Sequence, residues 1–295
     1  MRRASHPRTI LGNEMTGALR LMVVTAHPDD ETLGFGGVLA RYASEGIETF
    51  LLTATRGENG RYFGHGVDSP EHPGRAALSQ IRERELHAAA AALGVGQVSL
   101  LDYHDQELDR ADVAEAVTAI VEHIRRARPH VLLTFAPDGA YGHPDHIAIS
   151  QLTTAATVAS ADPEYGAERG RHLGPAHTVS KLYYLAWNAS TWAAYQAAFK
   201  RLVATVDGVE RQAAPWPDWA LTTVIDTRQW WATVWRAVSC HASQVGAYAA
   251  LKALDPSQHE ALWGSQSFYR AFSLVNGGRR RESDLFEGVD RLSHA

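Results

Sequence analysis

Strand-like and helix-like segments alternate from residue 20 to about residue 157, and this alternation restricts the chain to few folds. Apolar runs that indicate strands lie at residues 21–25, 48–54, 97–101 and 130–135. Segments with helical spacing of apolar residues follow them at 31–44, 78–93, 112–128 and 144–157. Such alternation is typical of a mostly parallel sheet flanked by helices. We therefore predict an α/β fold with helices on both faces of one sheet.

The order of the strands brings two polar motifs together. Right-handed crossovers and the usual doubly wound order place the first strand beside the fourth, with the second and third on the far side of the first. Ala-His-Pro-Asp-Asp-Glu at 26–31 follows the first strand, and Gly-His-Pro-Asp-His at 142–146 follows the fourth after a short loop. We expect the two motifs to meet where the strand order reverses, the usual ligand site of open α/β sheets.

The two motifs carry the side chains of a divalent metal site. His27 and Asp30 are three residues apart, so with Pro28 in the first helical turn they would share one face. The second motif supplies a third ligand, for which we favour His146 over His143. Two imidazoles, one carboxylate and an open coordination position are typical of a hydrolytic zinc ion, with ferrous iron as the alternative metal.

Other residues of the motifs have the chemistry of catalytic groups. Asp29 is predicted to be a general base that takes a proton from water and passes it to a leaving amine. His143, with Tyr141 close to it, is predicted to stabilise an oxyanion. A closed structural site that uses both His143 and His146 is the alternative, and it is less attractive because a sheet of this size needs no metal for stability.

Charge and composition exclude several other classes. The formal net charge of −5 argues against a dedicated nucleic-acid binder. Cys240 is the only cysteine, which excludes an intrachain disulfide and a thiolate zinc cluster. No apolar run reaches the ~18–20 residues of a membrane span, and no apolar stretch follows the basic start as in a secretory signal. The glycines at 34–37 lack the spacing of a dinucleotide loop. We expect a cytoplasmic protein.

The chain is expected to divide into three parts. Residues 1–18 are predicted to be a flexible tail, with Met15 as an alternative start to Met1, and residues 19–175 to be the metal-binding catalytic core. Residues 176–295 are predicted to be a smaller α+β extension that completes the sheet and the substrate pocket. It has strand-like runs at 179–187 and 221–226, a helix-like run at 227–251 and all eight tryptophans. Core packing or the interface of a homo-oligomer is favoured for these tryptophans over stacking on sugar rings.

The motifs resemble the two hallmark motifs of the LmbE-like family. This family includes N-acetylglucosaminyl-phosphatidylinositol de-N-acetylases and the deacetylases of mycothiol and bacillithiol synthesis. The likeness covers about residues 20–250, with further matches at 53–58, 84–86, 93–95, 101–105 and, more weakly, 239–244. It implies a Rossmann-like fold, a zinc ion bound by His27, Asp30 and His146, Asp29 as base, and His143 with Tyr141 at the transition state. The implied reaction is hydrolysis of an acetamide on a glucosamine-type sugar.

Departures from the family pattern affect the expected substrate. Residues 61–74 have no family pattern, and the longer insert expected before the second motif in mycothiol enzymes is missing, so an unspecified N-acetylglucosamine conjugate is favoured over a mycothiol precursor. Arg56, Glu58 and Asp105 are expected to contact sugar hydroxyls, with a loop salt bridge as an equal alternative for each. Two rival functions are an amidase for a larger amide and a non-catalytic module that binds a metal or a sugar. The presence of Asp29 argues against the non-catalytic module, because binding alone does not need that carboxylate.

Overall fold

The computed structural model describes residues 17–167, 170–199, 203–206, 208–244, 249–278 and 280–289. The predicted N-terminal tail, except for residues 17 and 18, and the choice between Met1 and Met15 lie outside the described residues. Within the described part of the chain, every helix is too short or too polar to cross a bilayer.

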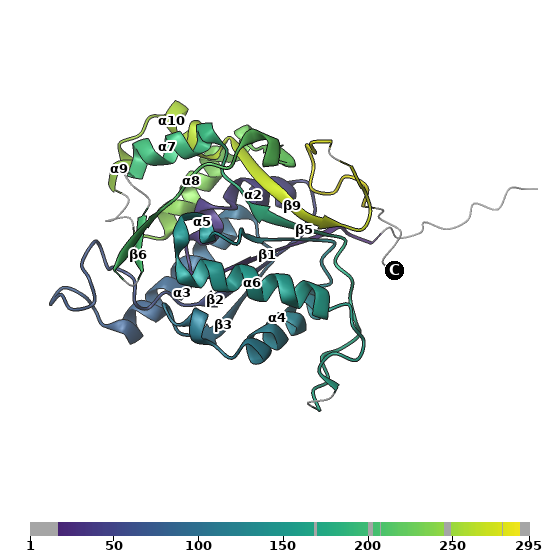
Figure 1. Ribbon diagram of the computed structural model, residues 1–295. Coiled ribbons are helices and arrows are strands. Elements are labelled where there is room, and N and C mark those ends of the chain that lie inside the picture. Colours follow the sequence, from purple (N-terminus) through teal and green to yellow (C-terminus); the bar gives the residue numbers. More distant parts are fainter. Residues whose placement is uncertain are drawn as a thin grey trace, which may run out of the picture.

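Seven strands form one sheet in the order β3-β2-β1-β4-β5-β9-β8 (Figure 1). The strands are β1 (Arg20–Thr25), β2 (Glu48–Thr55), β3 (Gln97–Tyr103), β4 (Val131–Phe135), β5 (Lys181–Leu185), β8 (Thr223–Asp226) and β9 (Ser265–Ser273). The pairs among β1 to β5 are parallel, whereas β9 pairs antiparallel with both β5 and β8. The predicted α/β class and the predicted neighbours of the first strand are confirmed.

Helices cover the sheet on both faces. They are α1 (Asp30–Leu33), α2 (Gly36–Ser44), α3 (Arg75–Leu93), α4 (Val113–Ala127), α5 (Gly139–Gly142), α6 (Pro144–Ala159), α7 (Ala189–Phe199), α8 (Trp231–Cys240), α9 (Ala249–Lys252) and α10 (Pro256–Trp263). Helix α4 packs against α6, and α8 packs against α2 and α3. The strand order runs from β1 to β3 toward one edge of the sheet and from β4 to β5 toward the other edge. Because the connections between parallel strands are right-handed, α2 and α3 lie on one face of the sheet and α4 and α6 on the opposite face.

The predicted helix at 31–44 is two helices, because tertiary contacts break it between Leu33 and Gly36. Gln266 of β9 reaches into the break, where its side-chain amide donates to the carbonyl of Gly34 (2.7 Å) and accepts from the backbone N–H of Val38 (2.6 Å). A Cβ atom on Gly36 would lie 2.9 Å from Val234 of α8, so α2 approaches α8 closely only with glycine there. The break ends α1 directly beside the carboxyl end of β1.

The C-terminal third agrees with the sequence in its strands and differs in its helix. The runs at 179–187 and 221–226 form β5 and β8, as predicted. The predicted helix at 227–251 is confirmed only over α8, and its bounds are wrong, because α8 ends at Cys240 where His241 turns into the interior and is fully buried. Elements without a prediction are α5, α7, α10, β9, the hairpin of β6 (Val203–Val206) and β7 (Val209–Gln212), and the 3₁₀ turns Leu108–Arg110 and Asp218–Ala220. The division of the chain at residue 175 stays a prediction.

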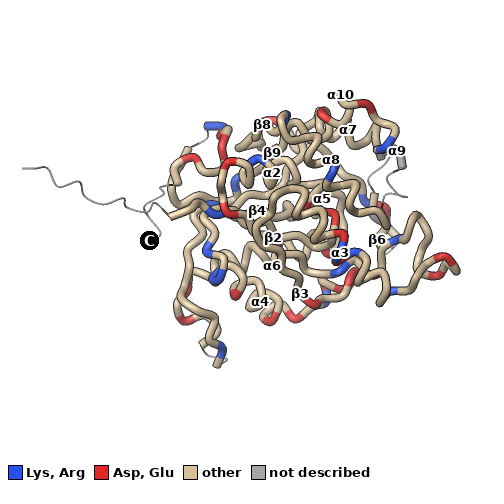
Figure 2. The backbone as a smooth tube through the Cα atoms, turned by 180° about the vertical axis from the view of Figure 1, so that it is seen from behind, with Lys and Arg blue, Asp and Glu red and all other residues tan. Residues whose placement is uncertain are grey.

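Acidic and basic residues are interspersed along the backbone (Figure 2), and one cluster of both signs is buried in the C-terminal part of the sheet. Lys181 of β5 donates to Glu282 (2.6 Å), and so does Arg270 of β9 (2.8 Å). The hydroxyl of Tyr183 donates to the other oxygen of Glu282 (2.6 Å). These hydrogen bonds connect the segment after β9, which carries Glu282, to β5 and β9.

Candidate metal centre and active site

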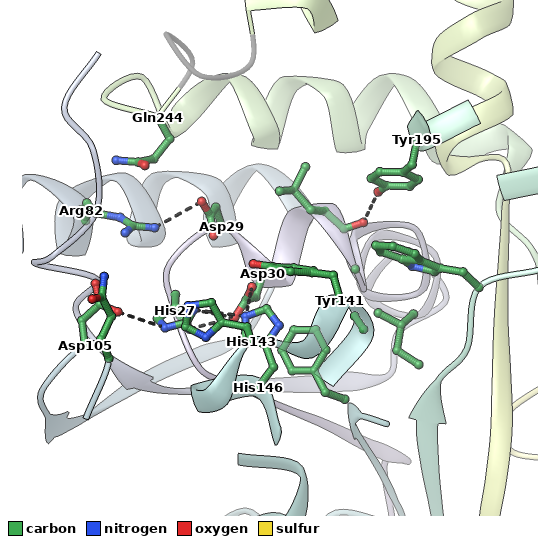
Figure 3. A pocket seen from close by; sticks show the side chains of 18 residues that line it. His27, Asp29, Asp30, Arg82, Asp105, Tyr141, His143, His146, Tyr195 and Gln244 are labelled. Atoms are coloured by element: carbon green, nitrogen blue, oxygen red, sulfur yellow. Dashed lines mark hydrogen bonds and ion pairs between the residues drawn. The ribbon is translucent and has the colours of Figure 1, made fainter. Parts of the chain in front are cut away.

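Polar side chains that follow β1, β3 and β4 converge on a cavity of about 220 Å³ (Figure 3). His27 follows β1, Asp30 begins α1, and His146 lies in the first turn of α6. Since β1 and β4 are neighbours, these residues meet although 119 positions separate the two histidines. Helix α1 begins only at Asp30, so His27 and Asp30 do not share a helical face as predicted. Instead Asp30 accepts the backbone N–H of His27 (2.8 Å).

The three predicted ligands form a small triangle of metal-binding atoms. Nδ1 of His27 lies 3.2 Å from Nε2 of His146, which lies 3.3 Å from Oδ1 of Asp30, and Oδ2 of Asp30 lies 3.7 Å from Nδ1 of His27. A tetrahedral ion with bonds of about 2.0–2.1 Å separates its ligands by about 3.3–3.4 Å. The two distances to Nε2 of His146 match this separation, whereas the 3.7 Å edge joins His27 to the other oxygen of Asp30 and is longer. The donor set of two imidazoles and one carboxylate is one that zinc binds.

Two carboxylates fix the orientation of the His27 ring. Nε2 of His27 lies 3.0 Å from Asp145 and 3.2 Å from Asp105. Both partners are acceptors, so Nε2 carries a hydrogen and Nδ1 faces the triangle. Burial acts against a charged ring, but these carboxylates and Asp30 outweigh it and raise the pKa of His27 well above its usual value. The carboxylates of Asp30, Asp105 and Asp145 thus favour a positive charge beside them, whether on the His27 ring or on a bound cation.

Asp145 contacts His27 and is a site residue that the sequence reasoning missed, although it lies inside the second motif. It is fully buried and accepts the backbone N–H groups of Gln106 (2.7 Å) and Leu108 (3.2 Å). Burial acts to raise the pKa of Asp145, but the hydrogen bond from His27 and that from the backbone of Gln106 lower it overall. Asp105 is also buried and contacts His27. Its position favours a role in orienting His27 over the expected contact with sugar.

Among the described residues, two groups of side chains have ligand atoms that all lie within 4.8 Å of one another, and neither group contains Asp30. They are His27 with His143 and His146, and His27 with Asp105 and Asp145. The first group is the alternative with both histidines of the second motif. In the second group, both oxygens of Asp145 already accept backbone hydrogen bonds. These contacts favour an orienting role for Asp145 over metal ligation.

His143 and Tyr141 are placed as hydrogen-bond donors beside the triangle. Nδ1 of His143 accepts the backbone N–H of Asp145 (3.2 Å), so in the neutral ring Nε2 carries the hydrogen. Burial and the neighbouring His27 and His146 lower the pKa of His143 to about 4, which keeps the ring neutral. Burial and the charge of nearby carboxylates raise the pKa of Tyr141, so its hydroxyl keeps its proton. Phe135 stacks on His146 at 4.0 Å and fixes that ring.

Asp29 lies next to the triangle in an unusual backbone conformation, with φ at 106°. Nη2 of Arg82 lies 3.2 Å from the Asp29 carboxylate, and Arg82 also donates to the carbonyls of Gly57 (2.8 Å) and Pro28. Burial raises the pKa of Asp29, and Arg82 counteracts part of that rise. Arg82 was missed because the apolar spacing of its helix gives no sign of an inward-pointing cation.

Arg56 and Glu58 line a second cavity rather than the one at His27. Arg56 forms ion pairs of 2.7 Å with both Glu83 and Asp102, and Glu58 lies 3.2 Å from His104. These contacts fit the alternative expectation for both residues, a loop salt bridge.

The cavity at His27 has a polar and an apolar side. Arg82, Asp105 and Gln244 lie on one side and Tyr195 on the other (Figure 3). The apolar side is lined by Leu33, Phe135, Leu185, Trp187 and Tyr195. Trp187 stacks on Tyr195 at 4.9 Å, so one tryptophan does line the site, whereas Trp263 is buried in the core.

The fold and the site together define an α/β protein with a candidate hydrolytic metal centre at its strand ends. The family model described as "GlcNAc-PI de-N-acetylase" (PIG-L) matches residues 22–157. A 1D-myo-inositol 2-acetamido-2-deoxy-alpha-D-glucopyranoside deacetylase of Streptomyces griseus is 34% identical over 300 residues, which cover 92% of this chain and 89% of that protein. The chain belongs to the PIG-L family, which is the LmbE-like family of the resemblance.

Solved structures share the fold. The N,N'-diacetylchitobiose deacetylase from Pyrococcus horikoshii superimposes with a TM-score of 0.64 at 18% identity, over 86% of this chain and 84% of that one. GalB, the 4-carboxy-2-hydroxymuconate hydratase from Pseudomonas putida KT2440, also gives 0.64 at 18% identity, over 88% and 99%. Since one of these proteins is named a hydratase, the fold alone does not identify a deacetylase.

Proposed function

We propose that this protein is a zinc-dependent N-deacetylase that releases acetate from an N-acetylglucosamine-type conjugate. The observation that carries the proposal is the triangle of His27, Asp30 and His146 with the Asp29 carboxylate beside it. The relative from Streptomyces griseus is named for an inositol-linked 2-acetamido sugar. An inositol conjugate is therefore the first substrate to test, and the preference against a mycothiol precursor, drawn from a missing insert, loses its support.

The chemistry divides between the ion and the side chains. A divalent cation held by His27, Asp30 and His146 would polarise the amide carbonyl and lower the pKa of water to about 7. Asp29 would accept the proton of the attacking water and deliver it to the amine as the carbon–nitrogen bond breaks. The raised pKa of Asp29 suits this exchange, since the group must first gain and then lose a proton.

The donors around the triangle would stabilise the negative charge of the transition state. Nε2 of His143 carries a hydrogen because Nδ1 of the neutral ring accepts one from the Asp145 backbone. The hydroxyl of Tyr141 keeps its hydrogen because its pKa is raised. Preorganised donors of this kind lower the barrier because they need no rearrangement as the charge develops. Arg82 would keep the Asp29 carboxylate in place during the proton transfers.

The decisive experiment combines a metal assay with a substrate panel. The purified protein is expected to bind about one zinc per chain and to release acetate from N-acetylglucosaminyl-inositol or a related glycoside. Asp29→Ala should lower turnover by about 10²–10⁴-fold and leave the zinc content unchanged. The exposed Asp68→Asn is the matched control and should behave as the wild type. Unchanged turnover in Asp29→Ala would remove the mechanism.

One observation favours a second candidate, an amidase for a larger amide. The apolar side of the cavity, with Leu185, Trp187 and Tyr195, offers more apolar surface than the single methyl of an acetyl group can cover. A series of N-acyl glucosamines with chains of two to eight carbons separates the candidates. A rate that falls beyond acetyl supports the deacetylase, and a rate that rises with chain length supports the amidase. Release of no amine from any substrate would leave the non-catalytic module.

A further inference from the structure

We propose that the buried pair of Glu31 and His241 positions Asp29, by holding its backbone in the conformation that directs the carboxylate toward the metal triangle. This inference rests on the proposed function, in which Asp29 is the base. Glu31 and His241 are positioning residues, because neither lines the cavity at His27.

The contacts form a chain from the interior to Asp29. Glu31 and His241 are both fully buried, and Nε2 of His241 lies 2.6 Å from Oε1 of Glu31. The other oxygen of Glu31, Oε2, accepts the backbone N–H of Asp29 (2.9 Å). One carboxylate thus joins the segment after α8 to the amide of the predicted base.

The backbone of Asp29 needs such a partner. Its φ of 106° lies in the left-handed region, which residues other than glycine seldom adopt. The hydrogen bond from the Asp29 amide fixes the orientation of the peptide group between residues 28 and 29. Thr32 adds a bond from its hydroxyl to the Asp29 carbonyl (2.8 Å), and Arg82 holds the carboxylate. Glu31 is the side chain that holds the amide end of this residue.

His241 contributes by fixing Glu31. It belongs to the segment at 239–244, which the family resemblance covers weakly and to which it assigns no role. Nδ1 of His241 has no hydrogen-bond partner among the described residues, so the ring is held through the contact of its Nε2 with Glu31. The carboxylate and the imidazole also satisfy each other in an interior where either alone would be destabilising.

A purely structural role for the pair predicts a different outcome from a positioning role. A pair that only fills and stabilises the interior would affect turnover through folding or metal content, whatever residue stands at position 29. A pair that acts through Asp29 loses its effect on turnover once the Asp29 carboxylate is gone. A double-mutant cycle between positions 31 and 29 separates the two.

In the first experiment, Glu31→Ala is expected to lower kcat at least tenfold, with the KM and the zinc content close to wild type. The unfolding temperature should fall, because His241 stays buried without its partner. Glu31→Gln keeps an acceptor for the Asp29 amide and is expected to retain most of kcat. In the Asp29→Ala background, Glu31→Ala should change the residual kcat less than twofold. Glu48→Ala, at the start of β2, is the control that leaves kcat unchanged. An equal fold-loss with and without Asp29 would overturn the proposal.

The second experiment does not depend on activity. Crystal structures of the metal-free Glu31→Ala and Glu31→Gln variants should show a changed Asp29 φ in the first and a retained positive φ in the second. A φ near 106° in Glu31→Ala would overturn the proposal even if the wild-type protein deacetylated no substrate. If Glu31→Ala does not fold, His241→Leu and His241→Gln replace the pair of variants, and a retained Asp29 conformation in both would again overturn it. Failure of the proposed function shows instead as a wild-type protein that releases no acetate.

Discussion

His27 uses the two nitrogens of one ring for different purposes, and this division shapes the whole site. Nε2 faces the carboxylates of Asp145 and Asp105, while Nδ1 faces Asp30 and His146. An ionised carboxylate accepts hydrogen bonds and donates none, so the contacts with Asp145 and Asp105 require a hydrogen on Nε2. They thereby leave Nδ1 as the nitrogen available to a metal ion. The candidate metal site therefore depends on residues that are not among its proposed ligands.

Asp145→Ala tests this dependence. Removing the carboxylate leaves His27 free to rotate or to change the nitrogen that carries hydrogen, so zinc affinity should fall by about 10–100-fold. Competition with a chromophoric zinc chelator measures the change. Asp109→Ala, an exposed acidic residue in the neighbouring 3₁₀ turn, should leave the affinity unchanged. Equal affinities in the Asp145 variant and the wild type would assign the orientation of His27 to Asp105 alone.

At the scale of the element, what the sequence predicted follows from local patterns. The strands at 21–25 and 130–135 are apolar runs of a buried parallel sheet, and the polar motifs at 26–31 and 142–146 follow them along the chain. That these motifs lie side by side follows from the predicted strand order. Arg82, the break after Leu33 and the early end of α8 were not predictable, since each depends on a contact with a residue far along the chain.

The turn after β2 is the element that seats Arg82. Gly57 has φ of +64°, and a Cβ atom there would lie 2.1 Å from Nη1 of Arg82. Gly57→Ala should therefore lower the free energy of unfolding by about 1–3 kcal/mol and lower turnover as Arg82 moves away from Asp29. Urea unfolding and acetate release measure the two effects.

Gly64→Ala is the matched control for this turn. Gly64 also has a positive φ, of +89°, but nothing lies within 4 Å of a Cβ atom placed there. The free energy of unfolding of Gly64→Ala should fall only by the cost of the backbone strain, and its turnover should stay unchanged. If both variants lost turnover equally, displacement of Arg82 would not be the cause.

At the scale of the molecule, the buried cluster around Glu282 connects the C-terminal segment to the sheet. Burial acts to raise the pKa of Glu282, but hydrogen bonds from Lys181 and Tyr183 outweigh it and lower that pKa to about 2. A carboxylate whose pKa is lower in the folded state stabilises the fold above its unfolded pKa of about 4.3. That contribution is lost as the pH falls from about 4.3 through 2.

Glu282→Gln should accordingly lower the free energy of unfolding by about 2–4 kcal/mol at pH 7, because Lys181 stays buried without its charged partner. The difference from the wild type should shrink as the pH falls below 4. Urea unfolding at several pH values measures both. Glu122→Gln, which breaks an exposed ion pair with Arg126, should change stability by less than about 1 kcal/mol. A difference that does not depend on pH would assign the effect to packing.

The wide separation of His27 and His146 along the chain also bears on how the protein is made. A ribosome adding about 5–20 residues each second needs several seconds to a few tens of seconds to pass from one histidine to the other. During that interval the nascent chain exposes the first motif, with its three consecutive carboxylates, before its partner exists. An ion held by all three proposed ligands could therefore bind only after about half of the chain has been made and β4 has paired with β1.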